Sequence, residues 1–88
     1  MSEAEIAERV KALLIDQFEL KAEDLTPDAT LYEKLELDSL DSVDLVVALE
    51  KEFGFKIVRA QDEGRISAMR RLNEVYGFIE SKLAEKGD

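Results

Sequence analysis

The sequence predicts an all-α domain, a small bundle of three long helices and one short helix, with a long loop between the first two helices. Apolar residues recur at helical spacing in separate stretches, and no stretch alternates with period two for long enough to form a strand. The chain's only proline falls between the first two helical stretches. With 88 residues, the chain is expected to form a single domain over residues 1–88, built around one hydrophobic core.

The first helix is expected over about residues 3–18. Ser2 and Glu5 have the spacing of a capping box, in which each side chain satisfies a free backbone N–H group at a helix start. The apolar residues that follow fall on one helical face: Ile6, Val10, Leu13, Leu14 and Phe18.

A long loop is expected over residues 19–37. Helical periodicity weakens there, and Thr26-Pro27-Asp28 is a turn signal because proline disfavours helical geometry in the residue before it. Leu25, Leu31 and Leu35 should attach the loop to the core, with a short turn of helix over residues 31–35. A connection of this length in a small domain is usually functional or disordered, and we expect an ordered loop.

The second helix is expected over about residues 39–53. Asp38 offers an N-cap side chain, Asp41 stands at the third helical position, and no glycine or proline interrupts the run before Gly54. Two apolar clusters share this helix. Leu45, Val46, Leu49 and Phe53 form the arc expected in the core.

The other apolar cluster of this helix, Leu40, Val43 and Val47, is offset towards the opposite side, beside Asp41 and Asp44. An apolar surface this wide exceeds the needs of one packed face. Either the preceding loop covers the second cluster, or the cluster stays exposed as an apolar patch with an acidic rim suited to protein docking.

The last third of the chain predicts a turn after Gly54, a short helical segment up to Ile66 anchored by Ile57 and Val58, and a final helix capped by Ser67. The apolar face of the final helix comprises Met69, Leu72, Val75, Tyr76, Ile79 and Leu83. Met69, Tyr76 and Phe78 are assigned to packing, although Phe78 falls off the main apolar face.

Composition narrows the possible functions. The chain has no cysteine and no histidine, which excludes thiolate metal sites and cysteine nucleophiles and argues against most hydrolytic chemistry. Residues 1–55 hold fifteen of the 21 acidic residues but only five of the 12 basic ones, within a net charge of -9. Such a surface repels nucleic acid and favours partner proteins with basic patches. With no apolar run near the length of a membrane span, we expect a soluble, cytoplasmic, monomeric protein.

Ser39 is the candidate for chemistry. It falls in the first turn of the second helix, where free N–H groups and the helix dipole favour a phosphate group. It can equally be an ordinary serine at a helix start.

Residues 35–54, LELDSLDSVDLVVALEKEFG, closely resemble the acyl carrier protein signature around its Asp-Ser-Leu attachment motif. The resemblance extends over the whole chain and implies a four-helix bundle that is not an enzyme. A separate phosphopantetheinyl transferase would attach a 4′-phosphopantetheine arm from coenzyme A to the Ser39 hydroxyl, reading Asp38 as part of the motif. The thiol of the arm would carry acyl intermediates as thioesters to the enzymes that load and process them.

The resemblance also assigns roles to two further sets of residues. The contacts with partner enzymes would be Leu40, Asp41, Val43, Asp44, Val47 and Glu50. The cleft that shelters the acyl chain from water would be shaped by Leu45, Val46, Leu49, Phe53, Ile57 and Ile66.

Some positions depart from the family pattern. Glu36 stands where many members have glycine, Lys51 where they often have an acid, and Val58 where a proline is common. The segment over residues 56–71 is also more basic than in housekeeping fatty-acid carriers. These departures predict a carrier dedicated to one pathway.

Alternative functions differ in what they require. An enzyme that used Ser39 as a nucleophile would need a base to activate it. The chain has no histidine, and the position three residues after Ser39, where some serine enzymes have a lysine, is Ser42. Asp38, Asp41 and Asp44 lack the spacing of a calcium loop. An unmodified acidic adaptor that binds basic partners, or a carrier of aminoacyl or polyketide cargo, both remain open.

Overall fold

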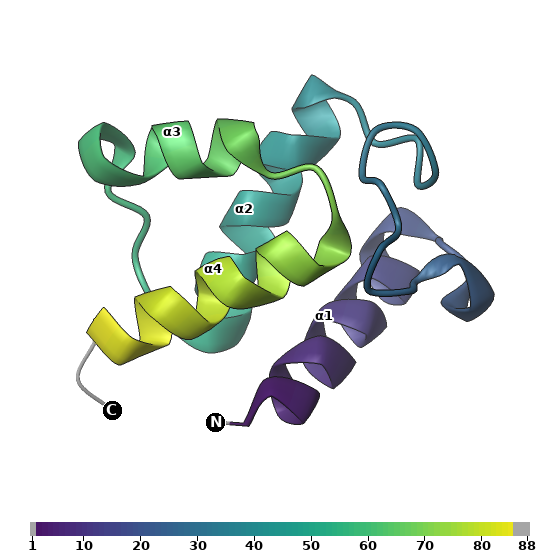
Figure 1. Cartoon of the computed structure of the whole chain (residues 1–88), viewed down its shortest axis with the longest axis horizontal. Helices are drawn as coiled ribbons and strands as arrows, with labels where there is room; N and C mark the ends of the chain where they lie inside the picture. The colour runs from purple at the N-terminus through teal and green to yellow at the C-terminus, as the bar shows by residue number, and fades with distance from the viewer. Residues whose placement is uncertain (1, 86–88) are drawn as a thin grey trace.

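The computed structural model describes residues 2–85, apart from the side chains of Ser39 and Arg59, and confirms the all-α fold (Figure 1). The described part contains four α-helices and one 3₁₀ helix: α1 (Glu3–Phe18), the 3₁₀ helix η1 (Ala22–Asp24), α2 (Ser39–Phe53), α3 (Arg59–Ala68) and α4 (Leu72–Glu85). The long loop joins α1 to α2, as expected, and α3 is the shortest α-helix.

The helix α1 has the predicted bounds and the predicted buried face. The backbone N–H of Glu5 donates to the Ser2 hydroxyl oxygen over 3.2 Å, which supplies one half of the expected capping box. The helix ends at Glu19, a left-handed residue with φ of 53°. The buried residues of α1 are Ile6, Val10, Leu13 and Leu14.

The loop between α1 and α2 is attached to the core by the three predicted leucines, Leu25, Leu31 and Leu35, all of which are buried. The short helical turn expected over residues 31–35 is present as a single hydrogen-bonded turn. The Thr30 carbonyl accepts the N–H groups of both Lys34 and Leu35, and no longer helix continues from it. The short helix of the loop lies earlier, at η1.

The loop is also tied by its backbone to the connection between α3 and α4, which lies beside it in Figure 1. The N–H of Leu31 donates to the Arg70 carbonyl over 2.8 Å, and the N–H of Leu72 donates to the Ala29 carbonyl over 3.0 Å. These bonds satisfy backbone groups that would otherwise be stranded near the core. They fix the start of α4 against a segment some forty residues away in the sequence.

Glu36 adopts a left-handed backbone conformation, with φ of 56°. A side chain is unfavourable in this region, whereas glycine enters it freely. A glutamate at this position therefore has a conformational cost, and the position falls three residues before Ser39.

The predictions for the last third of the chain need two corrections. Ser67 lies inside α3 and does not cap the final helix, which begins at Leu72. Val58 is exposed and Phe55 is buried in its place, because the chain turns after Gly54 and directs the ring of Phe55 towards Phe78 in an edge-to-face contact. Phe78 itself is buried.

Candidate functional site

The start of α2 carries the predicted cap. The Asp38 carboxylate accepts the backbone N–H of Asp41 over 2.9 Å, and the Asp41 carboxylate accepts the N–H of Asp38 over 3.2 Å. This reciprocal capping box fixes the point at which the chain enters the helix. Ser39 is the first residue of α2, and its side chain lies outside the described part of the structure.

An exposed apolar stripe runs along α2 from this start. Leu40 is 75% exposed, Val43 is 61% exposed and Val47 is 44% exposed. The loop therefore does not cover the second apolar cluster. Asp44 is exposed beside the stripe, whereas the capping residue Asp41 is half-buried.

Glu50 is turned towards the α2–α3 connection. Its carboxylate accepts the backbone N–H of Ile57 over 2.8 Å, and the side chain is half-buried. The hydrogen bond ties the last turn of α2 to the segment that leads into α3. Glu50 thus makes a structural contact within the bundle.

A surface hollow of about 680 Å³, here called the outer groove, opens between α2 and α3. Its apolar floor comes from both helices and the segment between them. Its lining residues are Tyr32, Ser42, Val43, Val46, Val47, Glu50, Ile57, Glu63, Ile66 and Ser67. Val43 and Val47 of the exposed stripe therefore form part of one side of the groove.

A much smaller hollow, the inner cavity, lies beneath the groove and has a volume of about 20 Å³. Five residues predicted for the acyl cleft line it: Leu45, Val46, Leu49, Ile57 and Ile66. Phe53, the sixth, does not line it. The ring of Phe53 instead stacks against the ring of Phe55, with centroids 6.4 Å apart.

The inner cavity has further walls that the sequence did not assign to it: Leu31, Tyr32, Ser42, Met69 and Phe78. Tyr32 and Ser42 also line the outer groove, and the Ser42 hydroxyl donates to the Tyr32 hydroxyl over 3.3 Å. This pair stands where the groove meets the cavity. One indication of this wall is present in the sequence: Phe78 lies off the main apolar face of α4, which suggests that α4 packs on a second side as well.

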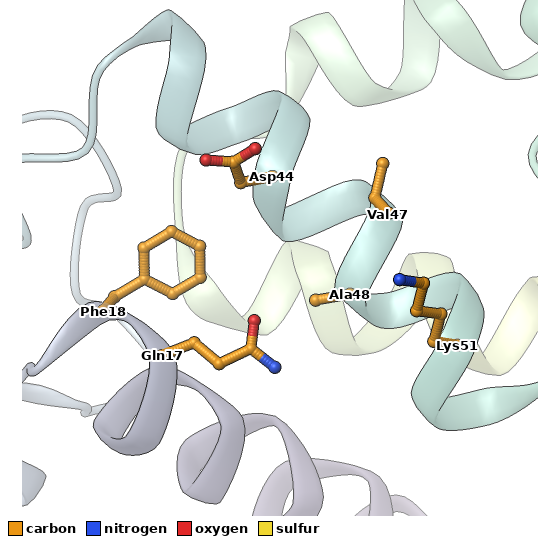
Figure 2. Close-up of a pocket in the computed structure, with 6 residues that line it drawn as sticks. All are labelled: Gln17, Phe18, Asp44, Val47, Ala48 and Lys51. Carbon is orange, nitrogen blue, oxygen red and sulfur yellow. The ribbon is translucent and has the colours of Figure 1, made fainter.

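Figure 2 shows a third hollow, of about 290 Å³, on the α1 side of α2. The ring of Phe18 and the side chain of Gln17 extend from α1 towards α2, where Asp44 and Ala48 point back towards α1 (Figure 2). Val47 and Lys51 of α2 complete the lining. Because Val47 borders both this hollow and the outer groove, α2 stands as a ridge between two depressions.

A buried ion pair joins α3 to α4. The Lys82 ammonium lies 2.7 Å from the Asp62 carboxylate, and the two side chains are only 5% and 3% exposed. The same Asp62 oxygen accepts the backbone N–H of Val58 over 2.8 Å. Burial raises the pKa of Asp62, but the hydrogen bonds from Lys82 and Val58 outweigh it, so the pKa is lowered overall. The hydrogen bond to Asp62 raises the pKa of Lys82 despite burial.

Comparison with known proteins identifies the family. Residues 8–60 match the family model described as a phosphopantetheine attachment site. An acyl carrier protein of Thermosynechococcus vestitus is 40% identical over 84 residues, which cover 96% of this chain and 99% of the relative. Acyl carrier protein 2 of Ralstonia nicotianae is 34% identical over 84 residues, with the same coverage of both chains. An acyl carrier protein of Solidesulfovibrio magneticus is 36% identical over 80 residues, covering 91% of this chain and 97% of the relative.

The chain belongs to the acyl carrier protein family. The cofactor of this family, phosphopantetheine, fits the start of α2. The first turn of α2 lies at the positive end of the helix dipole, which favours a phosphodiester. The neighbours of Ser39, Asp38 and Leu40, are both exposed, so the approach to this turn is open.

Among residues 2–85, no group of three or more potential metal ligands is placed to hold an ion. Over the same residues, no helix has the length and apolar character that crossing a membrane requires.

Proposed function

We propose that Ser39 is the attachment site of the 4′-phosphopantetheine arm and that this carrier presents acyl intermediates, as thioesters, to enzymes of fatty-acid, lipid or polyketide-type synthesis. The observation that carries the proposal is the position of Ser39. It is the first residue of α2, within an Asp-Ser-Leu sequence, inside the region that matches the phosphopantetheine attachment model.

Attachment needs no catalytic group on this chain. A separate transferase would join the phosphate of phosphopantetheine to the Ser39 oxygen, with loss of the hydroxyl proton and release of adenosine 3′,5′-bisphosphate from coenzyme A. The thiol at the end of the arm supplies the thioester chemistry. The chain itself contributes a fixed attachment point and a surface for enzymes to recognise, so we assign it no enzymatic activity of its own.

The exposed stripe of α2 is the proposed docking surface. Leu40, Val43 and Val47 would contribute apolar contact at the centre, and Asp41 and Asp44 would contribute charge at the edge. An apolar centre with a charged rim is typical of transient protein interfaces. We expect Glu50 to contribute less to partner binding than Asp41 and Asp44 do, because its carboxylate already accepts the N–H of Ile57.

The net charge of -9 supports partners with basic patches. Opposite charge steers two proteins towards each other and raises the association rate, and the effect weakens as salt screens it. The transferase and the enzymes that load and process the cargo should therefore bind faster at low ionic strength. We place this exchange of partners in the cytoplasm, with the carrier acting as a monomer dedicated to one pathway.

The first test is the intact mass of the protein before and after incubation with coenzyme A and a broad-specificity phosphopantetheinyl transferase. We expect the gain of one phosphopantetheine group, and no gain in Ser39→Ala. Ser42→Ala is the matched control, since Ser42 lies one turn further along the same helix, and it should still be modified.

The competing function is an unmodified acidic adaptor that uses the same stripe to bind basic partners. A folded protein that gains no mass with an active transferase would favour the adaptor. Modification of Ser42→Ala but not of Ser39→Ala would eliminate it.

The docking surface is tested separately through the rate of modification. Val43→Asp should raise the KM of the transferase for the carrier by about tenfold or more, because a charge replaces apolar contact at the centre of the interface. Ile15→Asp on α1 is the control, since Ile15 is an exposed apolar residue of a different face. An equal effect of both variants would contradict the assignment of the stripe.

A further inference from the structure

The helix α3 is held in the bundle by a charged residue. Of its described side chains, only that of Asp62 is buried, and the only large aliphatic one, Ile66, is half-buried. Every other α-helix contributes several buried apolar side chains to the core. The attachment of α3 therefore depends on what Asp62 contacts.

The Asp62 carboxylate makes two contacts with different consequences. Its bond to the backbone N–H of Val58 caps the start of α3, and its bond to Lys82 joins α3 to the last turn of α4. A carboxylate and an ammonium in such a buried position are tolerated only together, because each would otherwise be a charge without a partner. Moving α3 away from α4 would break the pair.

Exposed charges reinforce the same attachment. The Arg65 guanidinium lies 3.5 Å from the Glu85 carboxylate and 4.8 Å from the centre of the Phe78 ring. The other Glu85 oxygen lies 3.6 Å from the Lys82 ammonium. The buried pair is thus the centre of a four-charge network between α3 and α4.

The position of α3 sets the size of the inner cavity. Ile66 projects from α3 into the wall shared by the inner cavity and the outer groove, opposite Leu45 and Leu49 of α2. The inner cavity of about 20 Å³ has room for little more than one water molecule. More than the first carbons of an alkyl chain could enter it only if α3 moved outwards.

We propose that the Asp62–Lys82 ion pair is a clamp that keeps the inner cavity closed, so that this carrier buries short acyl chains only and leaves the rest of a longer chain in the outer groove. The inference rests on the proposed function for the identity of the cargo, since the acyl chain is carried on an arm at Ser39. The clamp itself is a property of the unmodified protein and is tested there first.

The first measurement is hydrogen exchange of the α3 amides in the unmodified protein. In Asp62→Asn, which keeps an oxygen for the N–H of Val58 but loses the charge, exchange over residues 61–68 should rise about tenfold or more relative to α1. Asp62→Asn/Lys82→Met, which leaves no buried charge, gives the same test if the single variant does not fold. Glu85→Gln, which changes an exposed member of the network, is the control and should have a much smaller effect.

The second measurement is chain-length selection. The chain has no cysteine, so Ser39→Cys introduces a unique thiol to which alkyl tails from ethyl to dodecyl can be attached through a spacer of pantetheine length. With the pair intact, Tm should rise with the first few carbons of the tail and then stay constant. With Asp62→Asn/Lys82→Met added, Tm should keep rising as the tail lengthens, because burying more of the tail stabilises the folded state.

Either of two results would overturn the clamp. One is α3 exchange that is the same in the Asp62 variants and in Glu85→Gln. The other is a Tm that rises with tail length equally in both backgrounds. Neither experiment uses a transferase, so a failure of Ser39 to accept phosphopantetheine would count against the proposed function alone.

Discussion

The helices α1 and α3 are attached to the same bundle by different forces. The 16-residue α1 buries four aliphatic side chains, three of which, Ile6, Val10 and Leu14, have no exposed surface. The ten-residue α3 has a single buried side chain among those described, and that side chain is the carboxylate of Asp62. The helix α1 is held by its buried apolar surface, whereas α3 is held mainly by the ion pair of one charged residue.

The two kinds of attachment respond differently to change. The hydrophobic effect is non-directional, and in α1 it is shared by several buried side chains. Each substitution in α1 therefore removes only part of the stabilisation. An ion pair depends on both partners and on one geometry, so α3 is released when either partner is lost. Of the two helices that border the outer groove, α3 is the one with the smaller apolar anchor.

The largest expected effect is on the α1 side. Leu14→Ala should lower the free energy of unfolding by about 2–5 kcal/mol, because it removes a fully buried side chain and leaves a cavity. Ile15→Ala, at the neighbouring position that is 41% exposed, should cost less than about 1 kcal/mol. Urea unfolding followed by circular dichroism measures both, and similar losses would mean that α1 is not held by its buried face.

The next effect is the loss of one partner of the buried pair. Asp62→Asn should cost about 3 kcal/mol, the lower end for a broken buried pair, because Glu85 remains near Lys82 as a substitute partner. Lys82→Met should cost a similar amount. The double variant should lose clearly less than the sum of the two, as expected for residues that interact directly. Additive losses in urea unfolding would argue against a direct interaction.

A smaller effect is expected from the apolar anchor of α3. Ile66→Ala should cost about 1 kcal/mol, since the side chain is only half-buried. Val58→Ala, at the exposed residue that precedes α3, should cost less than about 0.5 kcal/mol. A loss for Ile66→Ala as large as that for Leu14→Ala would show that α3, like α1, is held mainly by apolar burial.

The smallest effect concerns pH. The lowered pKa of Asp62 contributes stability that is present above its unfolded value of about 3.8 and is lost as the pH falls through the folded value. The raised pKa of Lys82 contributes stability that is present below about 10.5 and is lost as the pH rises through the folded value. The difference in unfolding free energy between the wild type and Asp62→Asn/Lys82→Met should therefore be constant from about pH 5 to 9 and change outside it.

This comparison with the double variant removes the contribution of the other charges, which both proteins share. Urea unfolding at a series of pH values gives the difference directly. A difference that varies strongly near pH 7 would mean that some other titrating group, and not the pair, controls α3.

The same contrast explains how much could be predicted from the sequence. The bounds of α1 and α2 were predicted correctly because both have strong periodicity, a capping side chain and, for α2, a glycine at the end. The exposure of Leu40, Val43 and Val47 was one of two alternatives, and the structure decided between them. In these regions the local pattern and the packing agree.

The α3 region could not be predicted in the same way. Its sequence has one large aliphatic residue, Ile66, so there was no periodicity to interpret, and Ser67 was mistaken for a cap. A charged residue such as Asp62 is normally expected at the surface. Its burial depends on Lys82, twenty residues further along, and that pairing has no local signal.

The residues of the candidate site also differ in whether a local sequence pattern indicates them. Asp38 and Ser39 were proposed from a local motif, and five of the six residues predicted for the cleft do line the inner cavity. Tyr32 and Ser42 were missed because they come together from a loop and a helix, through a contact that only the tertiary structure creates.

The segment that contains α3 is bounded by two backbone ties. Before it, the N–H of Ile57 is held by Glu50, and after it, the Arg70 carbonyl is held by the N–H of Leu31. The ten-residue α3, which lies between these ties, can therefore be regarded as an exchangeable segment. For protein engineering, grafting α3 from another carrier should change the groove without disturbing the rest of the bundle, provided that the graft supplies a carboxylate for Lys82.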